Sequence, residues 1–115
     1  MGYRSMNEVM NFLDRHDLDG AKACFHNEFM YLREVEMLTI DDMSEHFQEF
    51  IDGKLISTNR STQQDDEHSA AYTHDVKWNE NIRGVSAGTV ITVRVSALKK
   101  DGLIWRQMAK WTNKT

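Results

Sequence analysis

The chain has 115 residues, a formal net charge of −4, one cysteine and no proline. Acidic and basic residues are mixed along it, which argues against nucleic-acid binding, because that function needs a basic face. No apolar run approaches the roughly 18 residues of a membrane span, and the N-terminus lacks the apolar core of a secretion signal. A single cysteine cannot form a disulfide framework or a cysteine-based metal site. We therefore expect one domain over residues 1–115, in the reducing environment of the cytoplasm.

The N-terminal half carries helical patterns. Ser5-Met6-Asn7-Glu8 has the spacing of a capping box, and apolar residues follow it at helical intervals. Asp17-Leu18-Asp19-Gly20 is a poor helix interior, so a second short helix through Cys24 should form a bent pair with the first. Residues 28–33 are typical of a short strand. Residues 39–53 then fit an amphipathic helix that a threonine caps and a glycine ends.

From Lys54 onward, the spacing of the apolar residues changes from the period of a helix to the alternation of a strand. Residues 55–64 predict a polar, weakly patterned strand, and residues 69–78 alternate clearly. The strongest signal is a hairpin over residues 89–111, because Asp101-Gly102 supplies the positive φ angles of a tight turn. Helices followed by antiparallel strands predict the α+β class, with the N-terminal helices packed on one face of a curved antiparallel sheet.

Four local patterns occur in a characteristic order along nearly the whole chain. They are Asp17-Leu18-Asp19-Gly20 leading into Phe25-His26-Asn27-Glu28-Phe29-Met30-Tyr31, then Leu38-Thr39-Ile40-Asp41-Asp42-Met43, then Ser69-Ala70-Ala71-Tyr72-Thr73, and last Val93-Arg94-Val95-Ser96-Ala97-Leu98 with Asp101-Gly102 and Trp105-Arg106. Together they resemble the nuclear transport factor 2-like superfamily, and most closely its SnoaL-like branch. The resemblance implies a cone-shaped, cystatin-like fold that is usually dimeric through the outer face of its sheet. It implies a pocket rather than a particular reaction, because members of such a fold have many functions.

The alternation in residues 69–78 predicts part of that pocket. If Ala70 faces the interior of the cone, then Tyr72, His74 and Trp78 face it as well. For the following strand two alternatives remain. One directs Thr92, Arg94, Ser96 and Leu98 inward, and the other directs Ile91, Val93, Val95 and Ala97 inward.

We favour the alternative with Arg94 inward, because ligand pockets mix aromatic walls with a few polar groups. An outward Arg94 in a dimer interface is the competing interpretation. On the last strand Trp105, Gln107 and Trp111 are expected to line the same pocket, since the two tryptophans lie six residues apart and share a face. The tryptophans are equally suited to a dimer interface.

His74 is the first candidate for catalysis. A histidine in a half-apolar strand can have a pKa near working pH and serve as an acid or base, although a packed core histidine bonded to a backbone carbonyl explains it too. Tyr31 can direct its hydroxyl into the pocket as a donor to a carbonyl or enolate oxygen, or simply fill the core. Glu28, Glu34 and Glu36 surround the first strand, where a carboxylate base is an alternative to His74.

The five histidines are scattered, and no pair has the spacing of a zinc site, so we expect no metal and no other cofactor. The sequence predicts that an unidentified small, partly apolar molecule binds in the cone. Any catalysis would be cofactor-free proton transfer of the isomerase, dehydratase or cyclase type. The expected partners are that molecule and a second copy of the chain, with neither nucleic acid nor membrane. The competing hypothesis is a non-catalytic dimerisation or assembly module that uses the outer face of the sheet.

Overall fold

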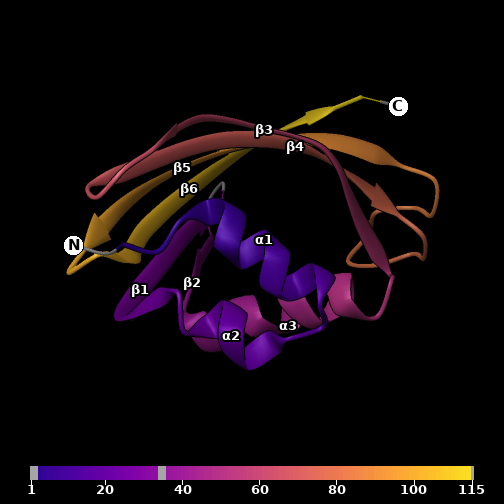
Figure 1. Ribbon diagram of the computed structural model, residues 1–115. Helices are drawn as coiled ribbons and strands as arrows, with labels where there is room; N and C mark the ends of the chain where they lie inside the picture. Colours follow the sequence, from indigo (N-terminus) through magenta and orange to yellow (C-terminus); the bar gives the residue numbers. More distant parts are fainter. Residues whose placement is uncertain (1–2, 34–35, 115) are drawn as a thin grey trace.

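The computed structural model describes residues 3–33 and 36–114, which form three helices and one six-stranded curved sheet. The helices are α1 (Met6–Asp14), α2 (Leu18–Lys22) and α3 (Ile40–Ile51). The strands are β1 (Phe25–Arg33), β2 (Glu36–Leu38), β3 (Leu55–Asp65), β4 (Ser69–Trp78), β5 (Val90–Lys100) and β6 (Leu103–Asn113). The sheet arches over the helices, which cover its concave face (Figure 1). This arrangement confirms the predicted α+β class.

The two longer helices begin at the predicted caps. Ser5 Oγ accepts from the Glu8 backbone N–H at 3.1 Å, and the Glu8 carboxylate accepts from the Ser5 N–H at 3.4 Å. Thr39 and Asp42 form the same reciprocal box at the start of α3. Such boxes satisfy N–H groups that have no partner within the helix. Each helix then buries one apolar stripe, made of Met6, Val9, Met10 and Leu13 in α1 and of Met43 and Phe47 in α3.

The sheet has the strand order β2-β1-β6-β5-β4-β3. The β5–β6 hairpin turns at Asp101 and Gly102, whose φ angles are 56° and 75°, as the sequence predicts. Strand β1 pairs with β6 in parallel, so the sheet is mixed rather than antiparallel throughout. No local pattern predicts β2, because three residues are too few to show an alternation.

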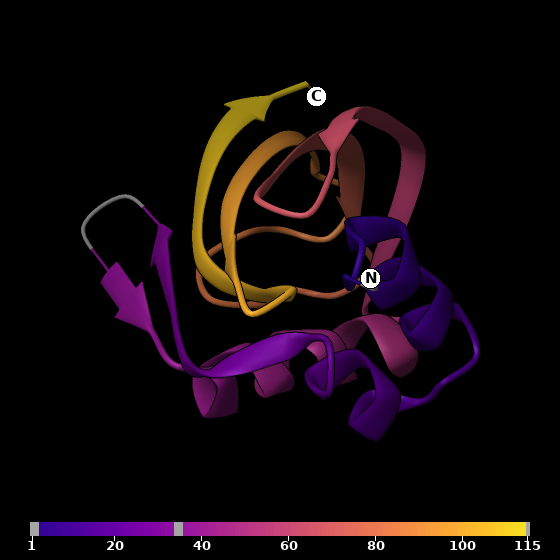
Figure 2. The same ribbon diagram turned by 60° about the vertical axis from the view of Figure 1, so that its left-hand side comes forward.

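The curvature of the sheet comes from irregularities in the ladders. Register shifts interrupt the β3–β4 pairing between Thr58 and Ser61, and the β5–β6 pairing between Leu98 and Lys99. Such bulges bend a strand and increase its twist. Viewed after a 60° turn, strands β3 to β6 curl around an interior that the helices close from below (Figure 2). The curl creates the concave surface on which the candidate site lies.

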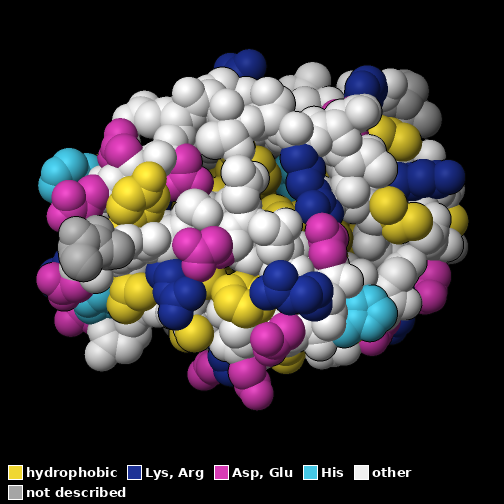
Figure 3. Space-filling model, in the orientation of Figure 1, with side chains coloured by type: hydrophobic (Ala, Val, Ile, Leu, Met, Phe, Trp, Pro, Cys, Tyr) yellow, Lys and Arg dark blue, Asp and Glu magenta, His cyan; other side chains and the backbone are white. Residues whose placement is uncertain are grey.

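The surface over the helices carries charges of both signs. Figure 3 shows Lys and Arg side chains interspersed with Asp and Glu on this face, with hydrophobic side chains exposed between them. Within the described residues, none of the helices is long and apolar enough to cross a membrane.

Candidate functional site

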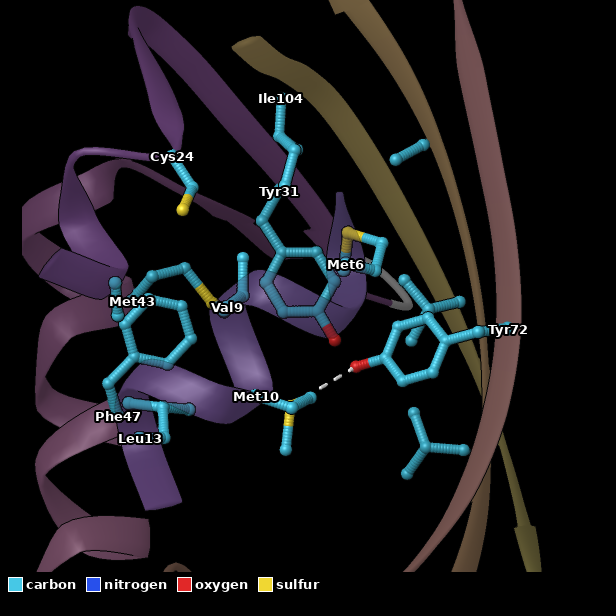
Figure 4. Close-up of a cluster of buried hydrophobic side chains, with 14 of the residues drawn as sticks. Met6, Val9, Met10, Leu13, Cys24, Tyr31, Met43, Phe47, Tyr72 and Ile104 are labelled. Atoms are coloured by element: carbon cyan, nitrogen blue, oxygen red, sulfur yellow. Dashed lines mark hydrogen bonds between the residues drawn. The ribbon is translucent and has the colours of Figure 1, made fainter. Parts of the chain in front are cut away.

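A cavity of 90 Å³ lies between the concave face of the sheet and the helices α1 and α3. Most of its lining is apolar and comes from both layers. The helices contribute Met6, Val9, Met10, Leu13, Met43, Phe47 and Phe50, and the strands contribute Phe25, Leu55, Val76, Val93 and Val95. Several of these side chains surround the two tyrosines in Figure 4. The cavity is partly open to solvent.

Two tyrosines enter the cavity from different strands. Tyr31 lies on β1 and Tyr72 on β4, and their hydroxyl groups point toward one another beneath α1 (Figure 4). The Tyr72 hydroxyl also lies 3.9 Å from the sulfur of Met10. Burial raises the pKa of Tyr72 far above neutrality, with the nearby Tyr31 adding to the effect. Tyr72 therefore stays protonated and can act only as a neutral hydrogen-bonding group.

His74 lies beside Tyr72 on the same strand and lines the cavity. It is 5% exposed, and its Nδ1 atom lies 2.6 Å from Ser57 Oγ. Its ring packs against Tyr72 and Phe50, at centroid distances of 5.1 Å and 6.4 Å. Burial, followed by the positive charge of Arg60, lowers its pKa to about 4. The expectation of a pKa near working pH is therefore wrong, because desolvation disfavours the charged form and His74 is neutral at pH 7.

Two further residues that line the cavity carry a buried polar atom without a partner among the described residues. Gln107, on β6, is 6% exposed, and its Oε1 atom has no hydrogen-bond partner among the described residues. The indole Nε1 of Trp78, on β4, also has no hydrogen-bond partner among the described residues. Trp111 packs edge-on against Trp78, at a centroid distance of 5.8 Å, and completes this wall. Buried polar atoms in proteins nearly always have partners, so these two atoms need an explanation.

A group of charged side chains borders the mouth of the cavity. Arg83, in the loop between β4 and β5, donates two hydrogen bonds of 2.6 Å and 2.8 Å to Glu49 of α3. His46 lies 3.4 Å from Glu49 and lines the cavity together with Arg83. Burial by itself raises the pKa of Glu49, but Arg83 and His46 outweigh it and hold that pKa below its usual value. The sequence interpretation missed this group, because an arginine in a polar turn gives no signal of its partner.

Two residues predicted to line the pocket do not. Arg94 is exposed on the outer face of β5, because Val93 and Val95 face inward opposite His74 and Tyr72. Burying valines rather than a guanidinium is favoured by the hydrophobic effect, so the parity that we favoured is wrong. Trp105 lies at the β5–β6 bulge, outside the cavity lining, with Arg106 4.0 Å from the ring centroid. The bulge breaks the alternation that would have placed Trp105 and Trp111 on one face.

Of the candidate carboxylates, only Glu28 has a described side chain, and it does not line the cavity. Glu28 is exposed on β1 and pairs with Lys100 at 3.3 Å. Glu34 lies outside the described residues, as does the side chain of Glu36. Among the described residues that line the cavity, none is Asp or Glu. A search of the same residues finds no cluster of three metal-ligating side chains. Burial raises the pKa of the Cys24 thiol to about 11, so that thiol is a poor nucleophile.

Comparisons with known proteins address the fold. No protein-family model matches the chain, and no curated sequence is significantly similar to it. Among solved structures, a proposed polyketide cyclase from Pseudomonas putida KT2440 superposes with a TM-score of 0.71 at 13% identity, over 92% of this chain and 87% of that one. A proposed ketosteroid isomerase from Kribbella flavida gives 0.66 at 16% identity, over 95% and 76%. A nuclear transport factor 2-like protein of unknown function from Cytophaga hutchinsonii gives 0.65 at 11% identity, over 92% and 85%.

The curved sheet, the helices on its concave face and these superpositions define one class of protein. The chain has the nuclear transport factor 2-like fold. This confirms the resemblance that the sequence suggested, at the level of the fold.

Proposed function

We propose that the protein binds a small, uncharged, partly apolar molecule in the cavity. The observation that carries this proposal is the pair of buried polar atoms without partners, Gln107 Oε1 and Trp78 Nε1, in a mainly apolar lining. Leaving such atoms unpaired costs about 1–3 kcal/mol each, and a ligand with one donor and one acceptor would remove that cost. His74 is neutral, and Arg83 at the mouth is already paired with Glu49, so the interior favours an uncharged ligand.

The volume limits the size of the ligand. At 90 Å³ the cavity is smaller than the roughly 300–1,000 Å³ of typical ligand pockets. It is also smaller than an engineered cavity of about 150 Å³ that binds benzene. A single small ring with one or two oxygen substituents is therefore the largest ligand that we expect, and one end of it would extend into the open mouth. A fused-ring ligand would require α1 or α3 to move away from the sheet.

Cofactor-free catalysis is the finer part of the proposal. Tyr31 and His74 would serve as hydrogen-bond donors to an oxygen that gains negative charge during the reaction. The cavity has no carboxylate base among the described residues, and a histidine with a pKa of about 4 is a weak base at pH 7. These features favour binding, or polarisation of a carbonyl, over proton abstraction.

The methionines provide a direct test with an internal control. Met6, Met10 and Met43 line the cavity, whereas Met37 and Met108 are exposed outside it. We would label the methionine methyl groups with ¹³C and titrate the protein with small cyclic ketones and alcohols. The proposal predicts saturable shifts of the cavity methyls while the outer methyls stay constant. Absence of a saturable shift for every compound would contradict it.

We propose homodimerisation as a second function, because the outer face of the sheet carries an apolar patch. This outer patch consists of Leu32, Met37, Leu98 and Met108, and the last of these is 58% exposed. Register pairs join Leu32 to both Met37 and Met108, so the residues are neighbours on one face. Exposed contiguous apolar surface of this kind is typical of protein interfaces. The groove along the patch and the candidate cavity have one lining residue in common, Gln107.

Sedimentation at several concentrations tests the second function. We expect the wild type to be a dimer and Met108→Glu to be a monomer, because a charge at the centre of an apolar interface is unfavourable. Ile56→Glu, at an exposed position on β3 outside the patch, is the control and should remain dimeric. A wild-type protein that stays monomeric at every concentration would exclude the dimer.

A further inference from the structure

A chain of contacts connects the surface of α1 to the cavity. The Asp14 carboxylate accepts two hydrogen bonds from Arg60, at 2.8 Å and 2.9 Å. Arg60 Nε in turn donates to Ser57 Oγ at 3.0 Å. Ser57 Oγ lies 2.6 Å from Nδ1 of His74, which lines the cavity. These contacts join α1, β3 and β4. Of the residues involved, only His74 lines the candidate cavity.

The irregular part of β3 brings Arg60 into this chain. The β3–β4 register is interrupted between Thr58 and Ser61, and Asn59 takes the left-handed conformation with φ 53°. Asn59 and Arg60 therefore lie opposite His74 without a regular ladder partner. The interruption allows the Arg60 side chain to turn back toward Ser57 instead of following the strand alternation. Bulges commonly redirect a side chain in this way next to functional sites.

The donors and acceptors in the chain indicate where the hydrogens lie. A guanidinium can only donate, so Ser57 Oγ must be the acceptor of the bond from Arg60. The serine hydrogen is then free to be donated to Nδ1 of His74, its other partner. The positive charge of Arg60 on this side also stabilises a lone pair, rather than a hydrogen, on Nδ1. A neutral imidazole with a lone pair on Nδ1 carries its hydrogen on Nε2.

The position of His74 determines what this hydrogen faces. Ser57 and Arg60 line a neighbouring surface pocket and not the cavity, whereas His74 lines the cavity and not that pocket. The Nδ1 edge of the ring is thus occupied by Ser57. Among the described residues, Nε2 has no hydrogen-bond partner. The ring therefore has one free donor on its cavity side.

We propose that Arg60 and Ser57 are positioning residues that hold His74 as its Nε2–H tautomer, so that the cavity selects a ligand with a hydrogen-bond acceptor, such as a carbonyl oxygen. This inference rests on the proposed function, because it specifies the chemistry of the ligand in the same cavity. It also turns the role of His74 from that of a base into that of a donor.

Long-range ¹⁵N–¹H spectra of the ligand-free protein at pH 7 test the tautomer. We expect His74 to carry its hydrogen on Nε2 in the wild type. Ser57→Ala and Arg60→Met should shift the population toward the Nδ1–H form, and Arg60→Lys should restore the wild-type tautomer, because lysine still donates toward Ser57. Arg94→Met is the matched control, since Arg94 is an exposed arginine on the outer face of β5. It should leave the spectrum of His74 unchanged.

Two results of this experiment would overturn the inference. The first is a wild-type His74 in the Nδ1–H form. The second is an Nε2–H form that persists in both Ser57→Ala and Arg60→Met, since those residues would then have no effect on the tautomer. Arg60 lies at the surface with its side chain 30% exposed, so Arg60→Met should fold even if Ser57→Ala does not.

A matched pair of compounds tests the selection of an acceptor. Cyclohexanone and methylenecyclohexane have nearly the same shape, and differ in whether an oxygen or a CH₂ group is attached to the ring. We would measure the ratio of their dissociation constants for the wild type and for Ser57→Ala. The preference for the ketone should fall about fivefold in Ser57→Ala, which is the effect expected from one hydrogen bond.

The two experiments separate the inference from the proposed function. An unchanged ratio overturns ligand selection by His74, even if both compounds bind. If neither compound binds, the proposed function and ligand selection both fail. The tautomer of the ligand-free protein decides the roles of Arg60 and Ser57 in either case.

Discussion

Two of the groups of buried polar side chains that the structure describes differ in how completely they are paired. At the end of the sheet beside the N-terminus (Figure 1), the Lys99 ammonium contacts the Asp65 carboxylate, and it donates to the Asp66 carbonyl at 2.6 Å. The ring of Tyr3 covers it at 4.4 Å. The second carboxylate oxygen of Asp65 accepts from the Met6 N–H at 2.8 Å. In the cavity, by contrast, Gln107 and Trp78 keep polar atoms without partners.

A buried polar group with a structural role can be fully paired in this fold, as Lys99 shows. The side chain of Lys99 is fully buried, and three contacts from two segments of the chain satisfy it. The same fold leaves Gln107 Oε1 without a partner among the described residues, although Gln107, at 6% exposure, is no more exposed than Lys99 at 9%. We infer that the unpaired atoms in the cavity receive their hydrogen-bond partners from a bound ligand. Four predictions follow the difference between the two groups, from the largest effect to the smallest.

Lys99→Met should cause the largest loss of stability. It removes the cation that pairs with Asp65 and leaves a mostly buried carboxylate with one remaining backbone donor. Breaking a buried ion pair from one side typically costs about 3–5 kcal/mol. Urea denaturation would measure the change. Lys100→Met is the control, because Lys100 is exposed on the same strand and should matter little. An equal loss in both variants would contradict the structural role of Lys99.

His74 should make the stability depend on pH above the range in which carboxylates titrate. Its pKa is about 4 in the folded protein, below the ordinary value of 6.5, so the unfolded chain binds more protons between these values. Stability is therefore greatest above pH 6.5 and is lost as the pH falls toward 4. Between pH 7 and pH 5 the contribution is about 2 kcal/mol.

The variant His74→Phe isolates this effect. Between pH 7 and pH 5, its free energy of unfolding should fall by about 2 kcal/mol less than that of the wild type. Urea denaturation at both pH values measures the difference. Parallel losses in the two proteins would mean that His74 is not buried as a neutral group.

Gln107→Leu should change the stability in the opposite direction from a typical core substitution, which lowers it. Leucine has a similar size and removes an amide that is buried without a partner, so stability should stay equal or rise by about 1 kcal/mol. Binding of ring compounds with a hydroxyl group should weaken, as seen in the methionine methyl titration. Gln64→Leu is the matched control at the other end of the sheet. Gln64 donates to Asp66 and Ser69, so its replacement should lower stability.

Arg83→Gln should give the smallest change in stability, below about 1 kcal/mol, because its ion pair with Glu49 is partly exposed. The expected effect is on exchange of the ligand, since Arg83 borders the mouth of the cavity. Dissociation of a bound ketone, measured from NMR line shapes, should become faster. Unchanged dissociation would show that the ion pair does not restrict the mouth.

The prediction of the site from the sequence depended on one clear local signal. Alternation within residues 69–78 assigns Tyr72, His74 and Trp78 to one face, and that face lines the cavity. The neighbouring strand alternates equally well, but alternation alone cannot say which face is inside. We decided that question by analogy with other pockets and chose the wrong face for Arg94. The greater hydrophobicity of the set with Ile91, Val93 and Val95 would have given the correct answer.

The sequence by itself determined most of the elements of this protein, because their signals are local. Helix caps, the Asp101-Gly102 turn and the change of period each involve residues a few positions apart. Only the tertiary structure decided the environment of His74. Ser57 lies 17 residues from His74, and Asp14 lies 46 residues from Arg60. Contacts at such separations depend on strand register and on bulges, which result from packing of the whole sheet against the helices and leave no periodic trace in the sequence.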